Sequence, residues 1–164
     1  MIKKISTLVL TMLGVGNSKY APGSVASFIT CFIYIIFYTY QVNILFLILG
    51  VFTIFIFSVY AIDEIENLFS EIDAKEIVID EFVGQSIPIL TIYNFIEKNN
   101  FDHFIFYTFI CFVLFRLFDI TKPYPINKID KKMKNGFGVI LDDVVAGLYS
   151  AIIILIIFIT TNHA

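Results

Sequence analysis

Residues 20–62 read YAPGSVASFITCFIYIIFYTYQVNILFLILGVFTIFIFSVYAI and contain no charged side chain. One transmembrane helix needs about 20 consecutive apolar residues. The stretch is therefore long enough for two crossings, at about 24–40 and 44–62. Residues 41–43 (QVN) form the one turn-like break between them, so the sequence predicts an integral membrane protein that contains a helical hairpin.

The composition of the whole chain agrees with a membrane protein. The 164 residues are 59% hydrophobic, which is well above a soluble domain, and their length predicts one domain spanning 1–164. The net charge of −3 gives no reason to expect nucleic-acid binding. Cys31 and Cys111 both lie in apolar runs, which favours small buried side chains over a disulfide framework.

Three further apolar segments follow the hairpin, at about 82–96, 104–118 and 144–161. The first of them contains Pro88, which predicts a kink. The segments 82–96 and 104–118 are short for full crossings, so they are expected to be tilted, half-inserted or buried among the others. A short apolar helix at 5–13 is expected to lie at the membrane interface and to stay in the mature protein. The predicted fold is all-α, a bundle of about four or five membrane helices.

The distribution of basic residues predicts the orientation of this bundle. If the five segments alternate across the membrane, three parts of the chain lie on the same side. They are the N-terminal segment 1–23 and the loops 63–81 and 119–143. That side holds every Lys and Arg except Lys98, with Arg116 just inside the helix end. By the positive-inside rule it is the cytoplasmic side of the inner membrane. The motif-rich loops, and with them an active site, are therefore expected at the cytoplasmic face.

Two of these regions nearly repeat one another. Residues 78–85 read VIDEFVGQ and residues 140–147 read ILDDVVAG, so each sets a pair of adjacent carboxylates before an apolar run. A charge in the middle of a membrane helix costs roughly 2.5–3.5 kcal/mol on insertion scales. Two acidic pairs at such positions indicate a shared role, and facing carboxylates are suited to holding a divalent cation.

Neighbouring positions on a helix point about 100° apart. Asp80 and Glu81 are therefore not expected to face one point without backbone adjustment, so one is predicted to bind a metal while the other orients a neighbour or binds a second ion. The alternative is a solvated helix start, where acidic residues favour the dipole. Gly136 and Gly138 precede the second pair and are expected to let backbone approach a ligand.

Basic side chains accompany the carboxylates. Arg116 and Asp119 are three residues apart and share a helix face, with Lys122 close behind. They form either a structural ion pair or a phosphate grip completed by Asp119. Lysines within 131–134 are expected to attract an anionic substrate or to reflect only the positive-inside bias. Residues 14–24 (GVGNSKYAPGS) form a Gly-rich turn before a helix, either an anion cradle or a simple turn.

Several phosphatase and hydrolase chemistries are absent from the sequence. It contains no Cys-x5-Arg loop, no DxDxT pattern and no GxSxG elbow. His103 and His163 fall on the side opposite the carboxylates, which argues against a histidine nucleophile. The remaining combination, carboxylates with phosphate-binding cations, suits hydrolysis of a phosphomonoester by activated water.

Four patches together resemble the phosphatidylglycerophosphatase A family. They are residues 14–24, 77–85 (IVIDEFVGQ), 115–125 (FRLFDITKPYP) and 136–147 (GFGVILDDVVAG). The resemblance implies a multi-pass membrane enzyme that needs Mg²⁺. It would remove the terminal phosphate of phosphatidylglycerophosphate in the bilayer and leave phosphatidylglycerol.

The resemblance and the residue chemistry together predict the site. The expected metal ligands are Asp80, Glu81, Asp142 and Asp143. The expected catalytic residues are Asp80, Asp119 and Asp143, with Asp119 taking the proton from water. The expected phosphate-binding residues are Arg116, Lys122, Asn17 and Lys19. Two alternatives stay open, a small ion or proton transporter that uses the carboxylates as a pathway and a lipid-headgroup transferase. The sequence does not predict the oligomeric state.

Overall fold

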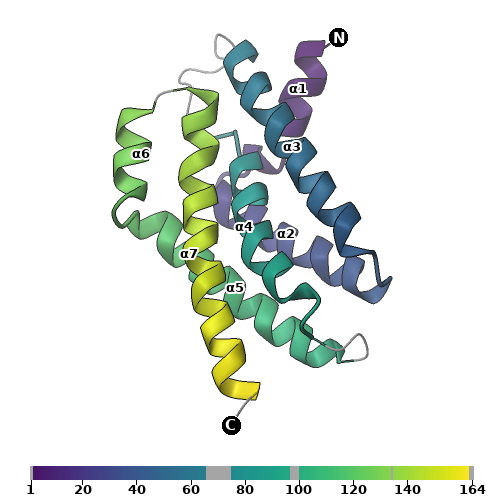
Figure 1. Cartoon of the computed structure of the whole chain (residues 1–164). Helices are drawn as coiled ribbons and strands as arrows, with labels where there is room; N and C mark the ends of the chain where they lie inside the picture. The colour runs from purple at the N-terminus through teal and green to yellow at the C-terminus, as the bar shows by residue number, and fades with distance from the viewer. Residues whose placement is uncertain (1, 66–74, 97–99, 134, 163–164) are drawn as a thin grey trace.

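The computed structural model describes residues 2–65, 75–96, 100–133 and 135–162, and these form helices and no strand. Figure 1 shows how the helices pack side by side. The helices are α1 (Ile2–Leu10), the short 3-10 turn η1 (Val15–Asn17), α2 (Pro22–Thr39), α3 (Ile44–Ile65), α4 (Ile79–Tyr93), α5 (Phe101–Thr121), α6 (Ile126–Lys132) and α7 (Gly136–Asn162). Lys98, Lys134 and His163, which entered the sequence argument, lie outside the described residues.

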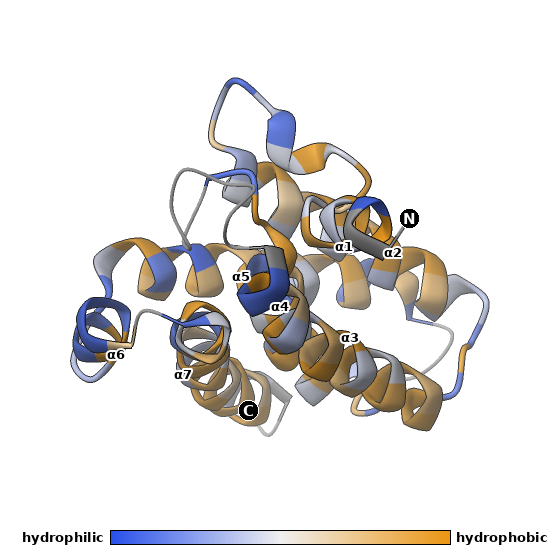
Figure 2. Cartoon of the chain, turned by 90° about the horizontal axis from the view of Figure 1, so that it is seen from above, coloured by the Kyte–Doolittle hydropathy of each residue, from blue (hydrophilic) through white to orange (hydrophobic). Residues whose placement is uncertain are grey.

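Four of the described helices are long and apolar enough to cross a membrane. They are α2, α3, α5 and α7, and the first two form the predicted hairpin. Figure 2 shows hydrophobic residues along most of α3 and α7. The segment predicted at 104–118 is part of the 21-residue α5, which is long enough for a full crossing. The predicted bundle of about four or five membrane helices is confirmed.

Helix α4 is the buried centre of the bundle. It has only 15 residues and packs against α2, α3, α5 and α7. Its Ile89 and Ile92 are fully buried, and Pro88 lies inside the helix. Of the alternatives for segment 82–96, burial among the other helices is the one observed, because the longer helices cover α4 on several sides.

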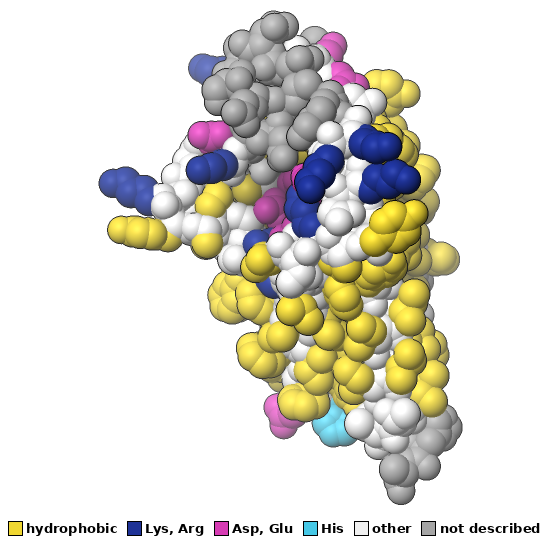
Figure 3. All heavy atoms as spheres, turned by 90° about the vertical axis from the view of Figure 1, so that its left-hand side faces the viewer, with side chains coloured by type: hydrophobic (Ala, Val, Ile, Leu, Met, Phe, Trp, Pro, Cys, Tyr) yellow, Lys and Arg dark blue, Asp and Glu magenta, His cyan; other side chains and the backbone are white. Residues whose placement is uncertain are grey.

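The chain alternates between the two ends of the bundle. The Tyr93 hydroxyl at the end of α4 donates a hydrogen bond of 3.1 Å to the carbonyl of Val42 in the hairpin turn. Helices α2 and α4 therefore begin at the opposite end, here named the charged end, and the beginning of α7 lies there beside them. Figure 3 shows hydrophobic side chains over the lower part of one face, with most Lys, Arg, Asp and Glu side chains gathered above them.

The two cysteines are free and buried, as their apolar surroundings predicted. The short N-terminal helix is also present as α1, and its last carbonyl, at Leu10, accepts a hydrogen bond of 3.0 Å from the backbone of Val78. This bond ties α1 to the segment that leads into α4. It holds the N-terminal helix next to the start of α4.

Candidate active site

A cavity of about 370 Å³ opens at the charged end of the bundle. It lies where the beginnings of α2, α4 and α7 meet the end of α5. Its lining residues are Pro22, Gly23, Lys75, Ile77, Asp80, Glu81, Asp119, Lys122, Val139, Asp142 and Asp143. The cavity therefore brings together all five predicted acidic residues and one of the predicted phosphate-binding cations.

Three of these carboxylates form a tight cluster. Asp80 and Glu81 from the first turn of α4 and Asp143 from α7 each offer an oxygen, and these oxygens lie within 4.8 Å of one another. The 100° separation of adjacent helix positions predicted that Asp80 and Glu81 would not share a point, and that expectation is wrong. Both side chains converge on Asp143 because α4 and α7 are packed closely enough to bring it within their reach.

Glycines set this close approach of α4 and α7. A β-carbon on Gly84 would lie 2.6 Å from the backbone oxygen of Asp143, and one on Gly147 would overlap the backbone oxygen of Gly84. The two helices make the most extensive contact in the bundle. Small residues at a helix crossing let two backbones approach, as in membrane helix pairs generally. The acidic pair of α7 is thereby brought against that of α4.

The start of α2 leaves the space that the Glu81 side chain occupies. A β-carbon on Gly23 would overlap Oε1 of Glu81 and would lie 3.3 Å from Nη1 of Arg116. Glycine at this position leaves the space that the Glu81 carboxylate fills. Pro22 lies at the first turn of α2, where its missing N–H costs no hydrogen bond. For the turn at 14–24, expected as either an anion cradle or a simple turn, the structure shows Gly23 against a carboxylate of the protein itself.

Arg116 links two carboxylates across the cavity wall. Its Nη1 lies 2.6 Å from Oδ2 of Asp119 and 3.9 Å from Oε1 of Glu81. It also donates a long hydrogen bond of 3.5 Å to the hydroxyl of Ser27. The predicted pairing of Arg116 with Asp119 is therefore observed. The same guanidinium also lies beside the three-carboxylate cluster, because Glu81 belongs to that cluster.

Lys122 forms a second bridge, on the α7 side of the cavity. Its Nζ donates to Oδ1 of Asp130 at 2.6 Å and to Oδ2 of Asp142 at 2.8 Å. Burial disfavours the charged ammonium, but hydrogen bonds and the charges of both carboxylates outweigh it and raise the pKa of Lys122 above its ordinary value of 10.5. The side chain therefore stays positively charged beside the cluster at neutral pH.

The donor set fits a hard divalent cation such as Mg²⁺. Oε2 of Glu81 and Oδ2 of Asp143 are buried and have no hydrogen-bond partner among the described residues. A buried carboxylate oxygen without a donor is costly unless a cation or ordered water satisfies it. All three clustered groups are carboxylates, which are ligands that Mg²⁺ accepts together with waters and substrate phosphate. Asp80, Glu81 and Asp143 are thus the residues suited to hold the ion.

The structure distributes the other predicted site residues differently. Asp142 lies outside the three-carboxylate cluster, although it lines the cavity, because it faces Lys122. Asn17 and Lys19 are exposed and do not line the cavity. Their assignment to phosphate binding stays a prediction.

Gly136 and Gly138 were expected to let backbone approach a ligand, and in the described residues they approach the protein itself. A β-carbon on Gly136 would overlap the backbone oxygen of Val59, and one on Gly138 that of Met133. The amide of Gly136 donates to Oδ1 of Asp63 at 2.6 Å, which caps the start of α7. Both glycines therefore serve the seating of α7 against its neighbours.

One contributor to the site was missed from the sequence. Asp130 holds Lys122, yet it lies in a short lysine-rich helix where an acidic residue carries no distinguishing pattern. Gly23 lies in the Gly-rich turn at 14–24 that the sequence singled out, but its role in leaving space for Glu81 was not predicted. The eight-residue spacing of Lys122 and Asp130 spans a turn and a new helix, so only the folded chain brings them together.

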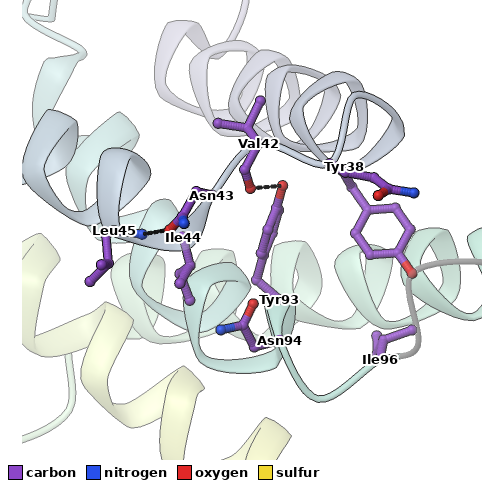
Figure 4. A pocket seen from close by; sticks show the side chains of 9 residues that line it. Tyr38, Val42, Asn43, Ile44, Leu45, Tyr93, Asn94 and Ile96 are labelled. Carbon is purple, nitrogen blue, oxygen red and sulfur yellow. Dashed lines mark hydrogen bonds between the residues drawn. The ribbon is translucent and has the colours of Figure 1, made fainter.

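A larger hollow of about 560 Å³ lies at the other end of the bundle. Figure 4 shows Tyr38, Asn43, Tyr93 and Asn94 around it, with the Tyr93–Val42 hydrogen bond on one side. All of its lining side chains are uncharged. Size alone therefore does not identify the functional site; the smaller cavity at the charged end has the chemistry.

Fold and cavity together define an integral membrane protein with an acidic, base-flanked site of the kind that acts on phosphate esters at a bilayer surface. The chain belongs to the phosphatidylglycerophosphatase A family, whose pattern matches residues 8–158. It is therefore a lipid phosphatase, and the resemblance carried by the four sequence patches is confirmed.

Individual relatives carry two different names. A Bacteroides thetaiotaomicron protein named "Putative phosphatidylinositol-3-phosphatase" is 34% identical over 92% of this chain and 91% of its own. The phosphatidylglycerophosphatase A of Escherichia coli is 30% identical over 88% of this chain and 78% of its own. That of Haemophilus influenzae is 40% identical over 50% of this chain and 45% of its own. No solved structure matches the chain.

Proposed function

We propose that the protein hydrolyses the terminal phosphate of phosphatidylglycerophosphate in a Mg²⁺-dependent reaction, releasing phosphatidylglycerol and inorganic phosphate. The observation that carries the proposal is the cluster of Asp80, Glu81 and Asp143 in one cavity with basic side chains at its wall. Two family relatives named phosphatidylglycerophosphatase A support the choice of substrate.

The charge balance of the cavity supports the need for a cation. Five carboxylates line it, whereas the basic groups in or beside it are Lys75, Arg116 and Lys122. A phosphomonoester carries negative charge of its own and would be repelled by the excess of carboxylates. One bound divalent cation would cancel this excess of two negative charges and so remove the repulsion of the phosphate.

Asp80, Glu81 and Asp143 would hold the Mg²⁺. When bound, the ion supplies Lewis-acid polarisation of the phosphate and lowers the pKa of a coordinated water. The protein's own contribution is to fix the three carboxylates in advance, through the α4–α7 crossing and the space at Gly23. Asp142 keeps Lys122 beside the ligands and does not need to bind the ion itself.

Arg116 and Asp119 would work as an exchanging pair. The guanidinium binds Asp119 at 2.6 Å, and phosphate oxygens are equally suited to it. When a substrate phosphate takes over Arg116, Asp119 becomes free to accept a proton from the attacking water. The oxygen of water bonds to phosphorus, the bond from phosphorus to the glycerol oxygen breaks, and that oxygen takes a proton from solvent. Lys122 steadies the phosphate.

The site would face the cytoplasm at the inner membrane. The charged end holds nearly all basic residues of the sequence, and the positive-inside rule assigns such loops to the cytoplasm. A lipid headgroup lies at the same level as the cavity, so the substrate does not need to leave the bilayer. The transporter alternative has no support from the comparisons, and residues 82–96 and 144–162 carry no charged residue toward the far end.

Phosphate release from the purified protein tests the proposal. The lipids to compare are phosphatidylglycerophosphate, phosphatidic acid and phosphatidylinositol 3-phosphate, each with Mg²⁺ and with EDTA. The third lipid is included because the Bacteroides relative is named for it. We expect fastest release from phosphatidylglycerophosphate, and only with Mg²⁺. Faster release from phosphatidylinositol 3-phosphate than from phosphatidylglycerophosphate would transfer the assignment to that substrate. Release from neither of these two lipids would refute the proposed specificity.

A further inference from the structure

Helix α6 has two sides of different chemistry. It packs against α7, and its Ile126 and Ile129 are buried and half-buried. Residues three and four apart share one side of a helix, so these two isoleucines mark the inward side. The outward side consists of exposed residues: Asn127, Lys128, Lys131 and Lys132. The three lysines, here named the lysine face, give this side three positive charges.

The one acidic residue of α6 is turned away from the lysine face. Asp130 follows Ile126 by four residues and is half-buried on the inward side. Its Oδ1 accepts a hydrogen bond of 2.6 Å from Nζ of Lys122, which lines the acidic cavity. This ion pair neutralises Asp130 and joins α6 to the wall of the cavity. The charge of the lysine face is therefore not compensated within its own helix.

The lysine face lies where the apolar surface of the bundle ends. Leu117 and Ile120, near the end of α5, are exposed apolar side chains, and the exposed Tyr124 follows them. Nζ of Lys128 lies 5.9 Å from the centre of the Tyr124 ring. Tyrosine is enriched at membrane–water interfaces, and Figure 3 shows Lys and Arg side chains gathered above the hydrophobic surface. These positions place the lysine face at the level of lipid headgroups.

Charge decides which lipids fit this face. A headgroup with a net negative charge is attracted to exposed lysines, whereas phosphatidylcholine carries no net charge. One lysine beside an anionic membrane surface increases binding about fivefold. The attraction extends over a Debye length of about 10 Å at 0.1 M salt, so lysines within about one turn of helix act on the same lipids. Acyl chains hold lipids at this level, which favours a lipid headgroup over a free anion from solution.

We propose that the lysine face of α6 binds the headgroups of anionic phospholipids and enriches these lipids at the mouth of the acidic cavity. For catalysis the inference rests on the proposed function, because a phosphatidylglycerophosphate molecule drawn to this face is already beside Lys122. Lipid binding itself depends on no phosphatase reaction. If the lysines reflected only the positive-inside bias, their removal would change neither lipid binding nor the apparent affinity for substrate.

A tryptophan reporter measures which lipids contact this face. The chain contains no tryptophan, so Tyr124→Trp introduces a single fluorophore beside Lys128. Tyr40→Trp introduces one at an exposed position at the other end of the bundle. Each purified protein is reconstituted in vesicles of phosphatidylcholine and phosphatidylglycerol at one fixed composition. Bromine on the acyl chains quenches nearby tryptophan, so brominating one lipid or the other reports the share of each beside the reporter.

We expect phosphatidylglycerol to be enriched about fivefold over phosphatidylcholine beside Tyr124→Trp and not beside Tyr40→Trp. Replacing all three lysines of the lysine face with glutamine should remove the preference. Replacing all three with arginine is the matched control and should keep it, because arginine retains the charge. Salt at about 1 M shortens the Debye length to about 3 Å and should remove most of the preference of the intact lysine face.

Three results would overturn the inference. They are equal quenching by the two brominated lipids beside Tyr124→Trp, an equal preference beside Tyr40→Trp, and a preference that the glutamine variant retains. The measurement at high salt needs no lysine variant, so the test stays decisive even where the glutamine variant fails to fold.

Kinetics on phosphatidylglycerophosphate in phosphatidylcholine vesicles extend the test to catalysis. The glutamine variant should raise KM, expressed as mole fraction of substrate, about fivefold and leave kcat unchanged, because the lysine face acts on lipid binding and not on the reaction. The arginine variant should match the wild type. A lower kcat with an unchanged KM would contradict enrichment at the cavity mouth. A wild-type protein that hydrolyses no phosphatidylglycerophosphate, while the reporters show the lipid preference, would overturn the proposed function and leave lipid binding by α6 standing.

Discussion

The carbonyl oxygen of Gly84 occupies the space that a β-carbon on Gly147 would need. This contact joins α4 to α7 one turn beyond the acidic pair of α4, and Gly84 in turn leaves room for the backbone of Asp143. Because backbone faces backbone, no change of side-chain rotamer relieves a larger residue. The convergence of Asp80, Glu81 and Asp143 therefore depends on two glycines that hold no ligand themselves.

Gly147→Ala is expected to push α7 away from α4. Overpacking at such a crossing costs about 1–3 kcal/mol, so the unfolding midpoint in detergent should fall and phosphate release should decline with it. Gly50→Ala is the control, since a β-carbon there meets nothing within 4 Å. Equal midpoints for the two variants would contradict the account of the helix crossing.

Gly23→Ala is expected to behave differently. Its β-carbon would overlap the end of the Glu81 side chain and no backbone, so the carboxylate has room to rotate away. The variant should fold with a midpoint close to wild type but lose about 10²-fold in phosphate release, the cost of a 1 Å misplacement in a site. Thermal unfolding and rate measurements on the same sample decide this, and full activity would show that the position of Glu81 is unimportant.

Asp143→Asn should separate function from stability. It removes a predicted ligand, so the rate should fall about 10²-fold or more, because the charge stabilisation from a bound metal is worth several kcal/mol. Without Mg²⁺ the variant should be at least as stable as wild type, because one of several clustered negative charges is gone. Asp102→Asn, at the far end of α5, is the control and should leave both quantities unchanged.

Asp130→Asn tests the bridge at Lys122. The folded state raises the pKa of Lys122, so its stabilisation is complete below the ordinary value of 10.5 and is lost as the pH rises through the folded-state pKa. Both side chains are partly exposed, so the variant should lose about 1 kcal/mol or less of unfolding free energy. Denaturant titrations should give a constant difference from about pH 7 to 9 and a shrinking one above pH 10.5. A difference in unfolding free energy that changes between pH 7 and 9 would show that a group other than Lys122 is responsible.

The helices and the acidic set followed from the sequence, since apolar length and the cost of buried charge are properties of short stretches. The sequence did not predict that Asp143 joins the carboxylate cluster while Asp142 pairs with Lys122. Neighbouring helix positions point in different directions, and only the crossing at Gly84 and Gly147 decides that Asp143 meets the α4 pair. In the same way, Lys122 was predicted to bind phosphate, and its partner Asp130, across a turn, was not predicted.

The Mg²⁺ dependence of phosphate release from phosphatidylglycerophosphate tests the central claim most directly. Purified wild-type protein, first stripped with EDTA, is titrated with Mg²⁺ beside the Asp143→Asn variant at one substrate concentration. We expect no release without the ion, a saturable rise for the wild type and a flat response for the variant. Release from the stripped wild-type protein at its full rate, or an equal Mg²⁺ response in Asp143→Asn, would contradict a metal held by Asp80, Glu81 and Asp143.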